Sequence, residues 1–256
     1  MTSRPQPEDF ARALLSRLEI QQPVNLERVA SAIRLRIRKV NSTGFDGAMK
    51  RLPGRALGIV AVRAAIRGVG RERFTIAHEI GHYVLPGHGT LSSICTAHEI
   101  TVQIKNNTEE EIAANRFATE LLLPAEQIHD LIRERALSIG TVRFIADRFQ
   151  TSLTAAVLQC VAVTDQTCAV VVSVAGIVRY YRSSKSWAYF IPVGCALDKH
   201  SLAARLDLLE SEATGVVNIF AWAPMGRIDS RAEVLENSIY LPPHNMVLTI
   251  LTAIPI

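Results

Sequence analysis

The sequence has 256 residues, of which 48% are hydrophobic and 20% charged, so it can bury a full core, and we expect one or two domains plus an appendage. The net charge is +4, and the positive charge lies mainly in residues 1 to 75, which hold 15 Lys and Arg against 6 Asp and Glu. This excess suits an acidic partner or nucleic acid, although isolated arginines on solvated faces explain the excess as well. The sequence shows neither a secretory signal nor an apolar run long enough to span a bilayer, which argues against a secreted or membrane protein. The four cysteines lack the spacing of a metal site or a disulfide framework, which argues against a zinc knuckle. We therefore expect a cytoplasmic protein with reduced thiols.

Four elements are predicted before the first chemical motif. Apolar spacing predicts helices near Phe10 to Leu18 and near Leu26 to Ala32. Apolar, β-branched runs predict strands near Leu35 to Val40 and near Leu57 to Val62. The second strand directly precedes a helix that carries two histidines.

The stretch RFTIAHEIGHYVL, residues 73 to 85, is predicted to be that helix. Its spacing places His78 and His82 on one face, about 5–6 Å apart at Cβ. Gly81 costs the helix about 1 kcal/mol relative to alanine, and Pro86 with the glycine after it ends the helix. Chance matches to HExxH number only roughly 0.01 in a chain of this composition, so the pattern indicates a metal site.

Two neutral histidines and one carboxylate are typical ligands of a catalytic zinc ion, which keeps a fourth position open for water. The ion lowers the pKa of that water from about 15.7 to about 7. Glu79 is rotated about 100° from His78 around the helix, so it would flank the ion and act as general base and then as proton donor. The ligand types suit zinc, and manganese and iron stay open as alternatives.

A long segment from Pro86 to Asn106 follows, and we expect it to wall part of the cleft. It repeats the letters AHE at residues 97 to 99, but position 102 is valine and the apolar alternation there is typical of a strand. We therefore do not expect His98 to be a metal ligand.

The stretch NTEEEIAANRFATELLLP, residues 107 to 124, is predicted to be a helix and offers the third ligand. Helical phase places Glu109 on a solvated face and leaves Glu110 and Glu111 as candidates. Glu111 is favoured because Asn115, one turn later, could hold a ligating histidine by its other ring nitrogen. Thr108 with Glu111 also fits a capping box, in which the glutamate would only satisfy backbone groups, so Glu110 and this capping role stay open.

The two motifs together, RFTIAHEIGHYVL and after about 25 residues EIAANRFATELLLP, closely resemble the ImmA/IrrE family of bacterial metallopeptidases. The resemblance covers roughly residues 10 to 160. It implies metal ligands at His78, His82 and Glu111, a catalytic base at Glu79, and an Asn115 that supports a ligand.

The sequence departs from the family at one place. Many members have another histidine soon after the motif helix, where this chain has Pro86 and, slightly later, His88. The oxyanion donor stays unassigned among Tyr83, His88 and His98. Metallopeptidases of this type bind substrate as a strand added along a sheet edge, so the strand just before the motif helix predicts an extended peptide as substrate.

Residues 126 to 163 are predicted to form a short helical module with the outline of a helix-turn-helix. A recognition helix presents Arg, Lys, Asn or Gln to base edges, and residues 151 to 163 offer only Gln159, so we do not expect direct DNA binding. Beyond residue 164, a helical stretch near Ser201 to Glu212 and five β-like runs predict a small α+β domain: CAVVVSV, GIVRYYR, WAYFIPVG, VVNIFAWA and MVLTILTAI. In some relatives this region is GAF-like, which implies a sensor of a small molecule or a partner.

The sequence thus predicts an α+β protein with a zincin-like metallopeptidase domain (1–125) built on an active-site helix and a small sheet, a helix-turn-helix-like module (126–163) and a C-terminal α+β domain (164–256). The expected function is a metallo-endopeptidase of narrow specificity that binds one zinc ion. By resemblance, its substrate is a helix-turn-helix transcriptional repressor in stress, mobile-element or toxin-antitoxin regulation. The alternatives are a non-catalytic, metal-containing regulatory protein and a DNA-binding protein; the oligomeric state stays open.

Overall fold

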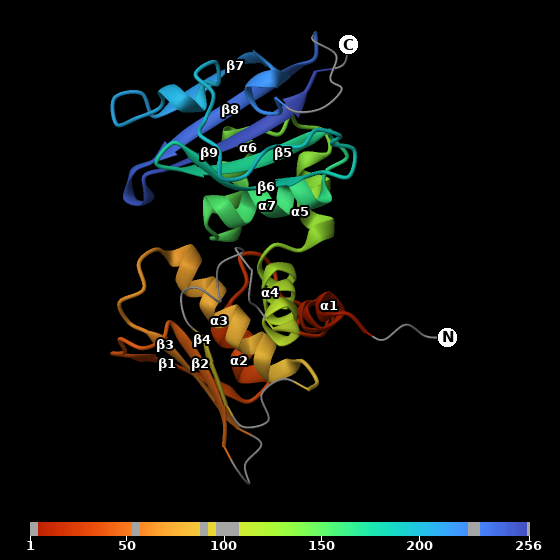
Figure 1. The fold of residues 1–256 in the computed structure, drawn as a ribbon. Coiled ribbons are helices and arrows are strands. Elements are labelled where there is room, and N and C mark those ends of the chain that lie inside the picture. The colour runs from red at the N-terminus through yellow and green to blue at the C-terminus, as the bar shows by residue number, and fades with distance from the viewer. Residues whose placement is uncertain (1–4, 53–56, 88–91, 96–107, 225–230, 255–256) are drawn as a thin grey trace. The chain divides into compact units, whose positions relative to one another are not determined.

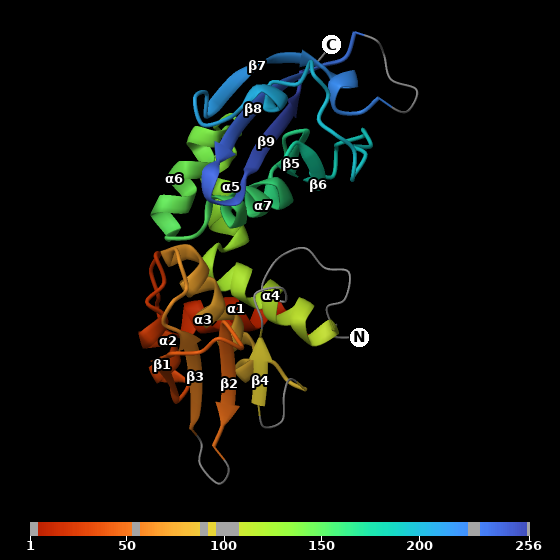
Figure 2. The same ribbon diagram turned by 60° about the vertical axis from the view of Figure 1, so that its left-hand side comes forward.

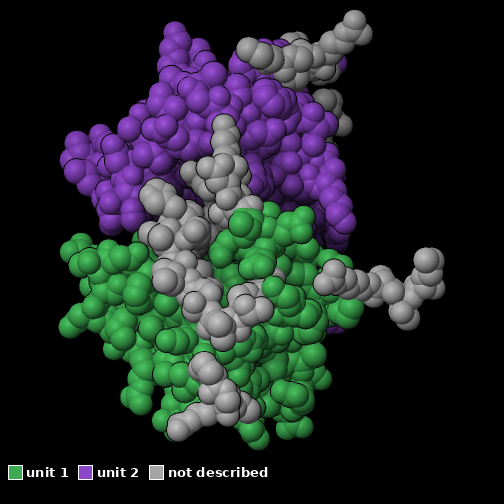
Figure 3. Space-filling model, turned by 60° about the horizontal axis from the view of Figure 1, so that its bottom comes forward, with its two compact units in different colours: residues 1–124, 146–152 green, residues 125–145, 153–256 purple. Residues whose placement is uncertain are grey.

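The computed structural model describes residues 5–52, 57–87, 92–95, 108–224 and 231–254 (Figure 1). The chain divides into two compact units, coloured separately in Figure 3: Met1–Pro124 with Ala146–Ser152, and Ala125–Ile145 with Leu153–Ile256. Helices and two sheets occur together, so the predicted α+β class is confirmed. The zincin-like and GAF-like assignments and the three-part division of the chain stay predictions.

Unit 1 contains a sheet with helices packed on it. Its strands lie in the order β1-β3-β2-β4, with β1 parallel to β3 and the other neighbours antiparallel (Figure 2). Its elements are α1 (Pro7–Arg17), α2 (Leu26–Ala32), β1 (Leu35–Val40), β2 (Gly47–Arg51), β3 (Gly58–Arg63), α3 (Val69–Val84), β4 (Ser92–Cys95) and α4 (Glu109–Leu122). The predicted bounds of α2 and β1 are confirmed. β2 was not predicted, and β4 lies in the segment from Pro86 to Asn106 that we expected to wall part of the cleft.

The strand before the motif helix is not an edge strand. β3 pairs with β1 on one side and with β2 on the other, so its backbone groups are used within the sheet. A substrate strand therefore could not add beside β3 itself, and the extended peptide as substrate stays a prediction. Among the described strands of this sheet, the edges are β1 and β4.

The core of unit 1 lies between the sheet and α3. Val60 and Val62 of β3 and Met49 of β2 are fully buried and face the helix because alternate residues of a strand point to one side. Ile80 of α3 and Phe117 of α4 continue this core, and α4 also packs on α1. The histidine helix is thus held between the sheet on one side and α4 on the other (Figure 2).

Unit 2 contains an antiparallel sheet in the order β6-β5-β9-β8-β7. Its elements are α5 (Ala125–Ile132), the first part of α6 (Ile139–Phe149), α7 (Leu153–Val163), β5 (Cys168–Val174), β6 (Ile177–Ser183), β7 (Glu212–Asn218), β8 (Glu233–Leu241) and β9 (Met246–Ala253). α7 packs against β5 and β6. Gln159, the one base-reading side chain of the predicted recognition helix, is buried.

Two predictions for unit 2 are wrong, and one strand was missed. The run WAYFIPVG is not a strand; it crosses the sheet as irregular chain, with Trp187 and Ile191 buried in the core. The helix expected over Ser201 to Glu212 is only the 3-10 turn Ala203–Arg205, and β8 was not predicted. Three other runs correspond to β5, β6 and β9, and VVNIFAWA is divided between the end of β7 and the 3-10 turn Ile219–Ala221.

A buried carboxylate explains the short turn. Glu236 of β8 is fully buried, and its Oε1 accepts hydrogen bonds from the Ala203 amide (2.7 Å) and the Ser238 hydroxyl (3.0 Å). Its Oε2 accepts from the Leu202 amide (3.1 Å) and the Trp222 indole (2.9 Å). A distant side chain therefore satisfies the free amides that open a helical turn.

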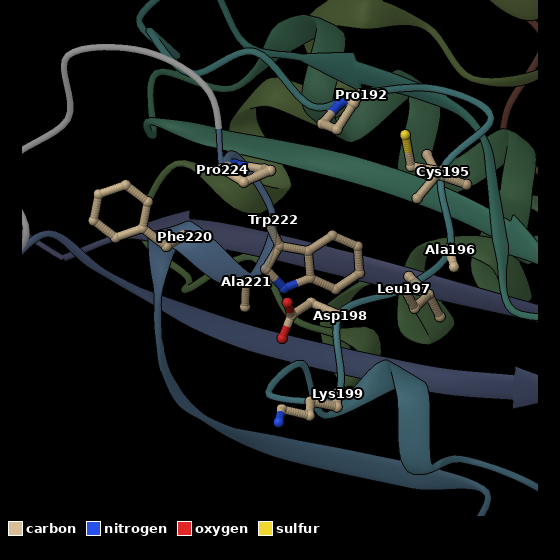
Figure 4. Close-up of a pocket in the computed structure, with 11 residues that line it drawn as sticks. Pro192, Cys195, Ala196, Leu197, Asp198, Lys199, Phe220, Ala221, Trp222 and Pro224 are labelled. Atoms are coloured by element: carbon tan, nitrogen blue, oxygen red, sulfur yellow. The ribbon is translucent and has the colours of Figure 1, made fainter.

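Unit 2 also has a surface pocket of about 450 Å³. Figure 4 shows Trp222, Phe220 and Asp198 among the side chains that border it. The Asp198 carboxylate already accepts hydrogen bonds from the backbone amide and the ring of His200. The pocket shows no recognisable ligand motif, and a sensor role stays a prediction. Within the described part of the chain, no helix has the length and apolar character needed to cross a membrane.

Candidate metal centre

The predicted histidine pair lies on α3, on the side that meets α4. His78 and His82 are almost completely buried. Gly81 lies between them in the sequence and packs tightly on α4: a Cβ there would be 3.0 Å from Cδ1 of Phe117 and 3.3 Å from Cα of Ala114. The glycine that weakens the isolated helix therefore permits the close packing that brings α4 to the histidines.

The first turn of α4 brings Glu111 to the same place. Thr108 caps the helix by accepting a hydrogen bond from the Glu111 amide at 3.3 Å. The Glu111 side chain turns to the histidines, while Glu110 is exposed on another face. The capping and metal-binding interpretations of Glu111 are thus compatible, because one uses its backbone and the other its carboxylate.

Three possible ligand side chains converge. Nε2 of His78 and Nε2 of His82 are 3.0 Å apart. Each is 3.1 Å from a different oxygen of Glu111. Ligand atoms at tetrahedral positions about 2.0–2.1 Å from a zinc ion are separated by roughly 3.3 Å, so this group fits such an ion with a small outward adjustment. It is the one group of at least three His, Cys, Asp or Glu side chains with metal-binding spacing in the described ranges.

Asn115 determines which nitrogen of His78 is available. Nδ1 of His78 is 2.9 Å from Oδ1 of Asn115. An amide oxygen only accepts, so Nδ1 carries a proton and Nε2, which faces Glu111, is the ring nitrogen left to bind a metal. This is the ring orientation that a metal ligand requires.

The charges at the centre favour an ionised Glu111. Burial raises the pKa of this carboxyl, but hydrogen bonds and charge interactions with His78 and His82 outweigh burial and lower the pKa from 4.5 to about 2. The carboxylate is therefore anionic at neutral pH and ready to bind a cation.

Glu79 lies on the side of α3 that faces β2. Its side chain is fully buried and runs against the start of β2, where Oε1 would be 2.6 Å from a Cβ at residue 47. Gly47 and its neighbour Asp46 did not emerge from the sequence as site residues, because the short strand that they begin was not predicted. The Asp-Gly pair formed by Asp46 and Gly47 was the available signal.

The oxyanion donor is not identified. The ring of Tyr83 packs on Gly58 of β3, and the Cζ atom of Arg51 lies over this ring, 4.3 Å from the ring centroid. His88 and His98, the other two candidates, are outside the described residues, as is the strand-like alternation after His98.

No curated protein matches this chain. The sequence pattern of the IrrE N-terminal-like domain, Peptidase_M78, matches residues 31–160, which is about half of the chain and includes all the residues of the centre. That description supports a function of the metallopeptidase type, acting on a protein substrate, and agrees with a His-His-Glu group that could hold a metal. The chain therefore belongs to the family of IrrE N-terminal-like M78 peptidases.

Proposed function

We propose that this protein is a zinc-dependent endopeptidase of narrow specificity, in which His78, His82 and Glu111 hold the ion and Glu79 is the catalytic base. The observation that carries the proposal is the convergence of three possible ligand side chains from two helices, with nitrogen and oxygen atoms 3.0–3.1 Å apart, on the helix that also carries the buried Glu79. When bound, zinc would supply a Lewis acid that makes water nucleophilic at neutral pH and polarises the peptide carbonyl.

The side chains of this chain then divide the work. Asn115 holds the Nδ1 proton of His78, so the ring presents Nε2. Glu79 accepts one proton from the attacking water at its carboxylate and delivers it to the leaving nitrogen as the C–N bond breaks. Burial excludes bulk water from this carboxylate, which strengthens its interaction with the reacting groups.

An extended peptide is the proposed form of the substrate. β4 pairs with β2 on one side and is an edge among the described strands, so a peptide could add along its other side. Its partner strand begins at Gly47, the residue next to Glu79, which supports this edge as the position of the substrate.

The biological setting that we propose follows the resemblance. The substrate would be a helix-turn-helix repressor cleaved in the cytoplasm during stress, mobile-element or toxin-antitoxin regulation. Residues 1–125 would cleave, 126–163 would form a helical module, and 164–256 would be a GAF-like sensor. A structural metal is less well supported, because the described group has three protein ligands where structural zinc takes four. DNA reading is less well supported because Gln159 is buried.

The decisive experiment measures cleavage of a proteome-derived peptide library by the zinc-loaded protein, with mass spectrometry to identify cut bonds. We expect about one zinc per chain and a small set of cut sequences. Glu79→Gln should retain zinc and lose cleavage, whereas Glu110→Gln, a change to an exposed glutamate on α4, should cut like the wild type. Cleavage that survives in Glu79→Gln or after zinc removal would contradict the proposal.

A further inference from the structure

We propose that Gly47, at the start of β2, is a positioning residue that determines where the carboxylate of Glu79 lies; its catalytic consequence rests on the function proposed above. Glu79 is fully buried against this strand. A Cβ at residue 47 would lie 2.6 Å from Oε1 and 3.0 Å from Cγ of Glu79. Nonbonded carbon and oxygen atoms normally stay well beyond 3 Å, so the carboxylate occupies the space that any other residue would fill.

The strand cannot easily move away from the carboxylate. β2 is internal to the sheet, where Gly47 is paired with Val62 of β3 and with Cys95 of β4. Hydrogen bonds on both sides of the strand therefore fix the height of its backbone above α3.

Asp46 fixes the same spacing by charge. Its side chain is buried, with a relative accessibility of 3%, and forms ion pairs with Arg63 at the end of β3 and with Arg71 of α3. The Arg71 contact is 2.7 Å long, and Arg71 lies about two helical turns before Glu79. The start of β2 is thus attached to the helix that carries the base.

The helix is also well ordered beside Gly47. Thr75, one turn before Glu79, donates a hydrogen bond from Oγ1 to the carbonyl of Arg71 at 3.0 Å. Its methyl carbon would be 2.7 Å from a Cβ at residue 47. Because the strand and the threonine are held, the far end of the longer Glu79 side chain is the group that an added methyl displaces. None of these contacts involves His78, His82 or Glu111.

The contact is tested first without metal or substrate, by urea unfolding of the apo-protein. Gly47→Ala should lower the urea midpoint in the wild type and lower it less in a Glu79→Ala background, which lacks Cγ and Oε1. It should lower the midpoint least in Thr75→Ser with Glu79→Ala, where all three close atoms are removed. Gly44→Ala is the matched control, since a Cβ there meets nothing within 4 Å. An equal drop in every background would overturn the proposal.

The catalytic consequence is tested with the best-cleaved peptide of the library. Zinc-loaded Gly47→Ala should have a kcat about 100-fold lower, with KM and zinc content unchanged, because a base displaced by about 1 Å loses this much. Thr75→Ser with Gly47→Ala should show the same low kcat, since the methyl still meets the carboxylate after the threonine clash is relieved. In Glu79→Asp, whose side chain is one methylene shorter, Gly47→Ala should cause little further loss of kcat.

Two results separate this inference from the proposed function. A wild-type kcat in Gly47→Ala, or a loss that appears in KM or zinc content, would overturn the positioning role. If the wild-type protein cleaves no peptide, the proposed function fails, and the urea series still decides whether Gly47 sets the position of the Glu79 carboxylate.

Discussion

Replacing Asn115 by alanine should weaken zinc binding without unfolding the protein. The change removes the Oδ1 atom that is 2.9 Å from Nδ1 of the buried His78 ring, so the ring loses the acceptor that fixes its proton on Nδ1. Losing a supporting hydrogen bond of this kind weakens metal binding by about 10- to 100-fold, or about 1.4–2.7 kcal/mol. Asn115→Asp keeps an acceptor at the same place and should bind zinc at least as tightly.

Competition between the protein and a chromogenic chelator for zinc measures this difference. Ile112→Ala, on an exposed position of the same helix, controls for a general effect on α4. Urea unfolding of the metal-free variants checks that each is folded. Equal zinc affinities for the wild type, Asn115→Ala and Asn115→Asp would refute the reasoning that this hydrogen bond prepares His78 as a ligand.

Three further predictions concern stability and thiol chemistry. The pKa of Glu111 is lowered from 4.5 to about 2, so its ionised form contributes up to about 3 kcal/mol to the stability of the metal-free protein. This contribution is present above pH 4.5 and is lost as the pH falls toward 2. Urea unfolding as a function of pH should show the loss in the wild type and not in Glu111→Gln. Gly81→Ala should destabilise the protein by about 1 kcal/mol, because overpacking against Phe117 and Ala114 outweighs the gain in helix propensity. The loss that Gly81→Ala causes should be smaller in a Phe117→Leu background, and a more stable Gly81→Ala would contradict the close packing. Burial raises the pKa of the Cys160 thiol to about 12 and that of the Cys168 thiol to about 11. Both thiols should therefore resist an aromatic disulfide reagent at pH 8 until urea is added. Rapid labelling of either cysteine in the folded protein, located by mass spectrometry, would contradict this prediction.

The elements that the sequence predicted well are those whose pattern is local. The helix periodicity around His78 and the acidic first turn before Glu111 depend on nearest neighbours along the chain, and the structure brings the two side chains together. β2 was missed because its five residues, GAMKR, include neither a β-branched residue nor a clear alternation, and its stability comes from pairing with β3 and β4.

The failures in unit 2 have non-local causes. Trp187 and Ile191 suggested a strand, but they cover a face of the sheet from an irregular segment interrupted by Pro192. Glu236 was unremarkable in the sequence, although it decides the conformation of the turn at Ala203. The same limit hid Gly47, whose meaning depends on a glutamate 32 residues later.

The four hydrogen bonds of Glu236 also have a consequence for biosynthesis. The amides of Leu202 and Ala203 and the indole of Trp222 leave the ribosome before the carboxylate that they bind. These three donors therefore lack the carboxylate that accepts their hydrogen bonds until β8 has been synthesised. A nascent chain that stops before residue 236 lacks the side chain that organises both turns. The C-terminal half of the protein should consequently acquire its native packing only late in translation.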